Sequence, residues 1–426
     1  MNNHYNSIYK KDLVEPEVFP SLKNNIECDV SIVGGGFTGL SSAIELAQAG
    51  LKVCIFEKEY IGYGASGRNG GHLVQGWSTD FYKLQKSIDK NDHKMAWNAG
   101  IEAVEIVTNR IKKYNIKCDL QMGYVYAALH KRHLSELIDM KQEWSNFGYK
   151  NLEVLGNKKN LQKYVNTDRY IGGLVDTGSG HLHPMKYLHS LARIAKNLGV
   201  KIFEKTFIIE RHDNATVLKT SESFEIKSSK ILFCGNAYLE GVSSKRMTDK
   251  LAPAISSVMA TKPLPKSLIQ SLIPKNCAVA DCNTALNYYR FDSNDRLIFG
   301  GSSIYSNISP RDAAPSLYRK MVYLFPSLKN IDIEMSWSGK IGITLSRIPH
   351  FGKLNKDVLF TQGYSGHGVA LTALAGKLMS EDILGKTNRF ETLSKISHLT
   401  FPGGIFRTPV LALGMSWFKF KDWLRI

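Results

Sequence analysis

The chain has 426 residues, which as a rough prior corresponds to two or three domains. Its hydrophobic content of 43% is ordinary for a globular protein that buries a large core. The formal net charge of +17 permits attraction to acidic partners. Because the lysines are spread along the chain, we expect a solvated basic surface and no nucleic-acid partner.

The sequence carries no sign of a membrane span, a secretion signal or a metal site. No stretch of about 18 apolar residues occurs, and "MNNHYNSIYKKDLVE" at the start lacks an apolar signal core. The six cysteines form no CxxC pair, and several lie in apolar runs such as "KVCIFE", as reduced core thiols do. Asp176, His181 and His183 have no metal-ligand spacing beyond H-x-H. We therefore expect a cytoplasmic protein without a metal.

The first elements predict an α/β fold. Residues 1–25 are polar and irregular, so we expect an arm on the surface. "CDVSIVGGG" is a continuous apolar run that ends in glycines, which predicts a buried parallel strand and a turn. "FTGLSSAIELAQAGLK" has helical spacing with Gly50 as its stop, and "KVCIFEK" predicts a second buried strand. Together they form a βαβ unit.

Further along, helices are predicted at 92–114, near 131–147 and at 183–199, with a strand at "GYVYAAL" between the first two. Residues 251–336 are rich in predicted strands, including "LNYYRFD" and "RLIFGG". "DVLFTQGYSGHGVALTALAGKLMSEDIL" then repeats the opening order of apolar strand, glycine loop and helix. The chain therefore returns late to the kind of unit with which it begins.

The first glycine motif, Gly34-x-Gly36-x-x-Gly39, follows a strand, opens a helix, and is followed by Glu57 at the end of the next strand. Gly34 permits a tight turn, Gly36 lets a pyrophosphate approach the backbone, and Gly39 lets the helix pack on the strand. The free N–H groups of the helix attract phosphate, and a carboxylate at Glu57 accepts hydrogen bonds from a ribose. The motif predicts a dinucleotide-binding site, and NAD and FAD would fit it equally well.

A second glycine loop, "GYGASGRNGGH" at 62–72, follows Glu57 closely. Five glycines in eleven residues are costly in backbone entropy, so something must approach this backbone closely. A simple NAD domain would continue into another helix here, whereas a longer cofactor would thread past a second loop. The loop therefore favours FAD, with Arg68 placed near a pyrophosphate or an anionic ring.

The stretch "VSIVGGGFTGLSSAIELAQAGLKVCIFEKEYIGYGASGRNGGH" resembles the FAD-dependent glycine/D-amino-acid oxidase (DAO) family. "ILFCGNAY", "WSGKIGITLSRIPHFG" and "FTQGYSGHGVALTALAGKLMSEDI" extend the resemblance over nearly the whole chain, and the tail after "FPGGIF" is most similar to the gamma-glutamylputrescine oxidase branch. The resemblance implies FAD contacts at Gly34, Gly36, Phe37, Thr38, Gly39, Glu57, Lys58, Ala65, Ser66, Arg68, Asn69, Gly70, Gly71, Gly235, Gly363, Ser365, Gly366 and Gly368.

The resemblance also implies the domain organisation: a FAD-binding, Rossmann-like domain of the glutathione-reductase type and a second, mixed-sheet substrate domain. We expect the FAD-binding domain at 26–90, 182–250 and 337–390. The substrate domain is expected at 91–181 and 251–336, followed by a C-terminal tail at 391–426. That tail mixes Leu, Trp and Phe with Lys and Arg, so peripheral membrane contact and packing on the domain are both open, and we favour packing.

Three departures from the family pattern affect the chemistry. Sarcosine oxidase relatives attach flavin to a cysteine in the segment that matches "GKIGITLSR", where this chain has none, so we expect non-covalent FAD. The lysine that assists their reaction with oxygen is matched by Ile298, which puts fast oxygen reduction in doubt. Ser346 replaces the usual Asp of the DR-x-P signature, so that contact is also in doubt.

Two histidines are candidate catalytic residues, His367 in the late glycine loop and His72 at the end of the early one. For each, the alternative is a loop histidine held by backbone hydrogen bonds. Tyr288, Tyr289 and Arg290 lie on a predicted strand whose alternate residues would line an amine pocket, although sheet packing alone explains either tyrosine.

We expect an enzyme that transfers a hydride from the carbon beside an amine to flavin, giving an imine that water hydrolyses. The substrate is a primary or secondary amine or amino acid, with a gamma-glutamyl-polyamine as one candidate and polyamine catabolism as its setting. Oxygen or another acceptor takes the electrons. The alternatives are a dehydrogenase that reduces a quinone or carrier, an RNA-modifying flavoprotein of the same family, and a flavin-bearing assembly subunit without turnover.

Overall fold

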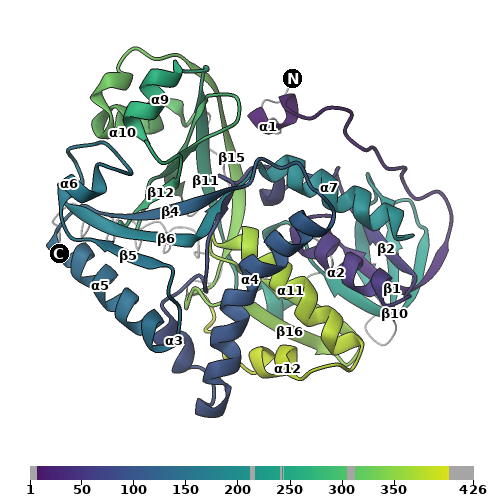
Figure 1. Cartoon of the computed structure of the whole chain (residues 1–426). Helices are drawn as coiled ribbons and strands as arrows, with labels where there is room; N and C mark the ends of the chain where they lie inside the picture. Colours follow the sequence, from purple (N-terminus) through teal and green to yellow (C-terminus); the bar gives the residue numbers. More distant parts are fainter. Residues whose placement is uncertain (1–6, 212–215, 240–241, 243, 305–311, 403–426) are drawn as a thin grey trace.

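The computed structural model describes residues 7–211, 216–239, 242, 244–304, 312–402 of the chain. Its strands form two separate sheets, which Figure 1 shows side by side with the helices α4 (His93–Lys113) and α11 (Gly368–Ile383) near their junction. Among the described residues the first sheet has eight strands and the second has nine. The α/β class and the mixed second sheet are as the sequence predicts.

The first sheet is built around the two apolar runs of the opening βαβ unit. Its main path runs β16-β17-β10-β1-β2-β7, in which β17, β10, β1, β2 and β7 are parallel and β16 is antiparallel to β17. The strands are β1 (Ile26–Val33), β2 (Val53–Phe56), β7 (Lys201–Phe203), β8 (Ile208–Arg211), β9 (Val217–Thr220), β10 (Glu225–Phe233), β16 (His350–Asn355) and β17 (Val358–Gln362). Because helices cover its faces, all four residues of β2 are buried.

The second sheet runs β15-β11-β14-β13-β12-β4-β6-β3, with β5 beside β6. Its strands are β3 (His72–Leu73), β4 (Gln121–Ala128), β5 (Leu152–Leu155), β6 (Gly172–His181), β11 (Ala252–Thr261), β12 (Ala278–Asp281), β13 (Tyr288–Phe291), β14 (Leu297–Ile304) and β15 (Ile333–Ile343). Most pairings are antiparallel, and β12 with β4 is parallel. This sheet therefore joins distant parts of the chain.

Helices fill the space around both sheets. α2 (Phe37–Gln48) packs against α11 and α7 (Pro184–Asn197), and α11 also packs against α4. The others are α3 (Phe81–Gln85), α5 (Lys131–Asn146), α6 (Lys158–Leu161), α8 (Lys245–Thr248), α9 (Lys266–Leu272), α10 (Ala314–Leu324) and α12 (Arg389–Ser394). No helix in the described part of the chain combines the length and apolarity that a bilayer crossing requires. The predicted helices at 92–114, 131–147 and 183–199 are confirmed.

One expectation about the N-terminus is wrong. The arm contains the short helix α1 (Ile8–Lys11), in which Ile8 and Tyr9 are completely buried. Figure 1 places α1 near the junction of the two sheets, at the end of a long connection to β1. Because residues 1–25 are mostly polar, their composition did not indicate that Ile8 and Tyr9 are buried against residues far along the chain.

The expected domain boundaries stay a prediction. At two places, the division of the strands between the two sheets differs from these boundaries. β3, within 26–90, pairs with β6 of the second sheet. β15 crosses the expected boundary at 336 and 337 and pairs with β11 along its whole length. From residue 403 onward, the expected tail lies outside the described residues.

Candidate functional site

The turn between β1 and α2 has the geometry that its glycines predict. Gly34 has φ +107°, and its amide donates to the Phe56 carbonyl at 2.9 Å. A Cβ at Gly39 would lie 2.0 Å from the Gly34 carbonyl oxygen, so only glycine lets α2 approach this closely. A Cβ at Gly36 would lie 2.9 Å from the Ser66 Oγ, and no other residue approaches it as closely. The N-terminus of α2 therefore meets the second glycine loop.

Glu57 closes this turn from the end of β2. One of its carboxylate oxygens accepts from the Gly35 amide at 2.8 Å and the other from the Glu59 amide at 3.0 Å. Burial raises the pKa of Glu57 above its usual value, against the effect of these two hydrogen bonds. The Glu57 carboxylate is thus held at the carboxyl end of β2, beside the N-terminus of α2.

The second glycine loop is tied to that N-terminus and to the second sheet. Ser66 Oγ accepts from the Phe37 amide at 3.0 Å, at the first residue of α2. Asn69 Nδ2 donates to the carbonyl of Ala65, and its Oδ1 accepts from the Gly71 amide. The loop therefore has a defined shape in spite of its glycines.

Arg68 holds backbone on both sides of the site. Its Nε donates to the Tyr63 carbonyl at 2.7 Å, and its Nη1 donates to the Ser338 carbonyl of β15 at 3.0 Å. The side chain lines the cavity described below. The sequence predicts Arg68 beside a pyrophosphate or an anionic ring, and the structure adds a second task, which is to join the loop to the second sheet.

The late glycine loop lies at the carboxyl end of β17, and α11 begins directly after it. The Gly363 amide donates to Asn236 Oδ1 at 2.9 Å, and the Ser365 amide donates to the Gly342 carbonyl at 3.0 Å. The Tyr364 hydroxyl lies 2.9 Å from Thr38 Oγ1, which joins this loop to α2. Gly366 is exposed and has φ +90°. Three segments far apart in sequence thus meet at one edge of the first sheet.

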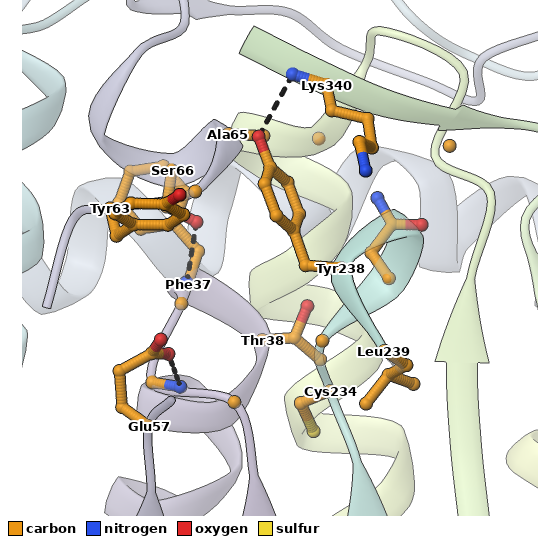
Figure 2. A pocket seen from close by; sticks show the side chains of 18 of the residues that line it. Phe37, Thr38, Glu57, Tyr63, Ala65, Ser66, Cys234, Tyr238, Leu239 and Lys340 are labelled. Carbon is orange, nitrogen blue, oxygen red and sulfur yellow. Dashed lines mark hydrogen bonds between the residues drawn. The ribbon is translucent and has the colours of Figure 1, made fainter. Parts of the chain in front are cut away.

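These segments enclose a cavity of about 530 Å³, within the range of small-molecule and cofactor sites. Figure 2 shows Glu57 and Phe37 on one side of it and Tyr238 and Lys340 on another. Predicted residues that line it are Gly34, Gly36, Phe37, Thr38, Glu57, Lys58, Ala65, Ser66, Arg68, Asn69, Gly235, Ser365, Gly366 and Gly368. Gly39, Gly70, Gly71 and Gly363 lie outside its wall, where they shape the backbone behind it.

The sequence prediction missed part of the wall. Tyr238 and Leu239 follow β10, and the Tyr238 hydroxyl accepts from the Lys340 amide of β15 at 2.9 Å (Figure 2). Thr206, Phe207 and Ile208 also line the cavity, as do several residues at 338–342. The position after a parallel strand was a usable signal for Tyr238, because the carboxyl ends of such strands converge on ligands. Lys340 lies in "WSGKIGITLSRIPHFG", a stretch whose resemblance to the family implies flavin contact, but the prediction does not name Lys340 itself.

The two candidate histidines lie outside the cavity wall. His367 is the N-cap residue of α11, and its Nε2 lies 3.0 Å from the Val74 carbonyl, to which it donates as an N–H. Burial lowers the pKa of His367 to about 4, so the ring is neutral near pH 7. These contacts favour the alternative of a loop histidine held by the backbone, and a catalytic role stays a prediction.

His72 lies in an aromatic group at the start of the second sheet. Its ring makes edge contacts with Tyr124 and Tyr288, with centroids 5.5 and 5.3 Å away, and its Nδ1 lies 3.5 Å from the Tyr124 hydroxyl. Burial lowers the pKa of His72 well below its usual value. Within the described part of the chain, its buried Nε2 has no hydrogen-bond partner. By contrast, Tyr289 is buried and stacks on Phe299, so it serves packing.

The fold and the cavity define a flavoprotein-type oxidoreductase. A family model described as FAD dependent oxidoreductase (DAO) matches residues 29–382, and the chain belongs to this family. It is 36% identical to gamma-glutamylputrescine oxidoreductase of Escherichia coli over 428 residues, with 100% of both chains covered. The DAO resemblance seen in the motifs is thereby confirmed.

Solved structures support the fold. L-proline dehydrogenase from P. horikoshii superposes with a TM-score of 0.72 at 20% identity, covering 86% of this chain and 95% of that one. Glycine oxidase from Geobacillus kaustophilus gives 0.70 at 19% identity, covering 85% and 95%. At these identities the two structures show a shared fold.

Proposed function

We propose that this chain binds FAD without a covalent link and oxidises a C–N bond of an amine or amino acid. The observation that carries the proposal is the cavity, in which both glycine loops, Glu57 and the N-terminus of α2 face one space. A Cβ at Gly36 would lie 2.9 Å from Ser66 Oγ, so the glycine lets the early loop approach the helix N-terminus, where phosphate is favoured.

In the proposed complex, the N–H groups at the start of α2 bind the pyrophosphate, and Glu57 accepts from the ribose hydroxyls. The late loop at 363–368 lies at the N-terminus of α11, where N–H groups and the helix dipole stabilise negative charge. FAD, when bound, supplies the hydride acceptor. The chain orients that acceptor and provides donors where charge develops.

For the amine, we propose the aromatic group around His72 as the binding surface. Tyr288 touches this group and the early loop together, because a Cβ at Gly70 would lie 2.5 Å from the Tyr288 ring. Hydride transfer needs an uncharged amine, and aromatic faces with a neutral histidine accept one without a buried charge. The Nε2 of His72, for which the described part of the chain offers no partner, is suited to accept a hydrogen bond from the amine.

We propose gamma-glutamylputrescine as the first substrate to test, because the relative with that name is 36% identical over the full chain. The experiment is an anaerobic screen of the purified yellow protein with gamma-glutamylputrescine, putrescine, glycine, L-proline and D-alanine. Rapid loss of flavin absorbance with one amine is the expected result. If neither these amines nor a wider set of amines reduces the bound FAD, the result would instead support an assembly subunit without turnover.

A second candidate differs only in the electron acceptor. Ile298, which stands where oxidase relatives carry a lysine, is buried in the core of the second sheet. That observation favours a dehydrogenase that passes electrons to a quinone or carrier. Oxygen consumption during turnover supports an oxidase, whereas turnover only with an artificial quinone supports the dehydrogenase.

The non-covalent link has its own test. The described segment at 339–347 contains no cysteine, and among the described residues that line the cavity Cys234 is the one cysteine, with 6% of its surface exposed. Acid precipitation should leave the yellow colour in the supernatant. Colour that remains in the pellet would show a covalent bond and contradict this part of the proposal.

A further inference from the structure

The early glycine loop has few side chains with which to hold itself in place. Five glycines in the segment 62–72 leave its backbone with a large entropy to lose on ordering. Yet Ala65, Ser66, Arg68 and Asn69 of this loop line the cofactor cavity. Its own Ser66, Arg68 and Asn69 hold part of the loop, and tethers from elsewhere in the molecule hold three more of its backbone groups.

Three carbonyl groups of the loop receive such tethers. Ser7 Oγ donates to the Gly67 carbonyl at 3.0 Å. Trp337 Nε1 donates to the Arg68 carbonyl at 2.9 Å. Arg290 Nε donates to the Gly70 carbonyl at 2.7 Å. The donors come from the N-terminal arm, β15 and β13, and all three residues are buried.

Tyr9 connects these tethers. Its ring makes an edge contact with Trp337, with centroids 5.3 Å apart, and its hydroxyl accepts from Arg290 Nη2 at 3.5 Å. It is completely buried. Trp337 and Arg290 donate to the carbonyls of Arg68 and Gly70, and Tyr9 contacts both donors. Removal of the Tyr9 ring would leave these two donors without their common neighbour.

The other end of the same short segment is anchored by charge. Asp12 accepts from Arg296, from His183 Nε2 at 3.2 Å and from Asn294 Nδ2 at 3.0 Å. Burial opposes the charge of Asp12, but the hydrogen bonds from His183 and Arg296 outweigh it and hold the pKa of Asp12 below its usual value. Asp12 therefore fixes α1 against α7 and the second sheet.

We propose that residues 7–12 are a clasp that positions the early glycine loop for the cofactor, with Tyr9 and Ser7 as positioning residues. The proposal goes beyond amine oxidation, since it concerns how the chain prepares its own backbone. The expected effect of the clasp on cofactor binding rests on the proposed binding of FAD. The expected effect on the order of the loop does not.

The test compares Tyr9→Ala and Ser7→Ala with Tyr82→Ala, which removes a tyrosine that is 46% exposed on α3. Hydrogen exchange of the full-length apo protein should show at least about tenfold faster exchange in peptides covering 62–71 for Tyr9→Ala. FAD titration of the same proteins should show binding weakened by at least about tenfold, and a smaller loss for Ser7→Ala. Tyr82→Ala should match the wild type in both measurements.

Two results would overturn the clasp. One is exchange at 62–71 that equals the wild type in both variants. The other is exchange that rises equally throughout the chain, since that would show general destabilisation in place of loop positioning. If Tyr9→Ala does not fold, Ser7→Ala removes only one hydrogen bond and gives the same decision by itself. Tyr9→Phe, which keeps the ring contact with Trp337, should recover most of the loop protection.

Discussion

At the scale of single residues, Glu57 has two tasks that compete. Its carboxylate accepts from the amides of Gly35 and Glu59, while burial raises its pKa. In the free protein the charge is therefore costly, and a ribose hydroxyl pair would give it further partners. Both affinity for the cofactor and stability of the free protein should therefore depend on the two acceptor oxygens of this carboxylate.

Glu57→Gln should weaken FAD binding by about 1.5–3 kcal/mol, the range for hydrogen bonds to a charged group. The free variant should melt at a lower temperature, because the amide nitrogen of glutamine cannot accept a hydrogen bond and either the Gly35 or the Glu59 N–H loses its acceptor. FAD titration and thermal melting of the apo protein measure the two effects. Glu27→Gln, the same change at an exposed position of β1, is the control. Equal FAD affinity in the Glu57 variant and the wild type would contradict the ribose assignment.

At the scale of elements, the glycines of one motif do different work. Gly39 lets α2 lie against the turn, whereas Gly36 borders the cavity and is the N-cap of the helix. The late loop makes the same kind of junction between β17 and α11. In both units the strand directs its end toward the cavity, and the helix offers its N–H groups there.

Gly39→Ala should cost about 1–3 kcal/mol of folding stability, because its Cβ would lie 2.0 Å from the Gly34 carbonyl oxygen. Gly36→Val should also cost the apo protein about 1–3 kcal/mol, because its Cβ would lie 2.9 Å from Ser66 Oγ, and it should in addition reduce FAD binding at least about tenfold, which Gly39→Ala should not. Denaturant melts of the apo proteins and FAD titration separate the two effects. A Gly36→Val protein that purifies with full flavin would show the cofactor assignment at this turn to be wrong.

Gly366→Val should keep much of its FAD while flavin reduction by substrate slows at least about tenfold, or about 1.4 kcal/mol. The reason is strain: Gly366 has φ +90°, and an added Cβ would meet no atom within 4 Å. The strain should shift the N–H groups before α11, which act on charge that develops only during reduction. Stopped-flow absorbance under anaerobic conditions measures this step.

Gly199→Val is the control for that strain, since Gly199 has φ +88° with equally open surroundings after α7. It should lose similar folding stability without slower flavin reduction. Wild-type reduction rates in a folded, FAD-loaded Gly366→Val protein would remove the late loop from the chemistry.

At the scale of the whole molecule, several histidines are neutral because they are buried. Burial lowers the pKa of His181 and His350 to about 3 and that of His189, His367 and His398 to about 4. In the unfolded chain these groups titrate near 6.5, so between pH 6.5 and 4 the unfolded state binds more protons. Burial raises the pKa of Asp281 to about 6 and also raises the pKa values of Glu57, Asp176 and Glu143, and these four carboxyl groups act in the opposite direction.

The melting temperature should therefore fall as the pH is lowered from about 6.5 to 4, because the histidines outweigh these carboxyl groups. His189→Gln should flatten this dependence, since the shift of His189 corresponds to up to about 3 kcal/mol at pH 4. Thermal melts of apo protein across this pH range provide the measurement, with His93→Gln, at the less buried first residue of α4, as control. A wild-type melting temperature that is flat from pH 6.5 to 4 would contradict the account.

The amino-acid sequence by itself determined the opening βαβ unit, the dinucleotide turn and the two glycine loops, because each rests on local patterns of apolar and small residues. Glu57 followed from its place at a strand end. Only the tertiary structure decided that the Lys340 amide of the second sheet donates to the Tyr238 hydroxyl, that His367 is held by the Val74 carbonyl, and that α1 is buried against the early loop. These contacts join residues from about 60 to almost 300 positions apart, and no local periodicity records which distant side chain will meet a given backbone group.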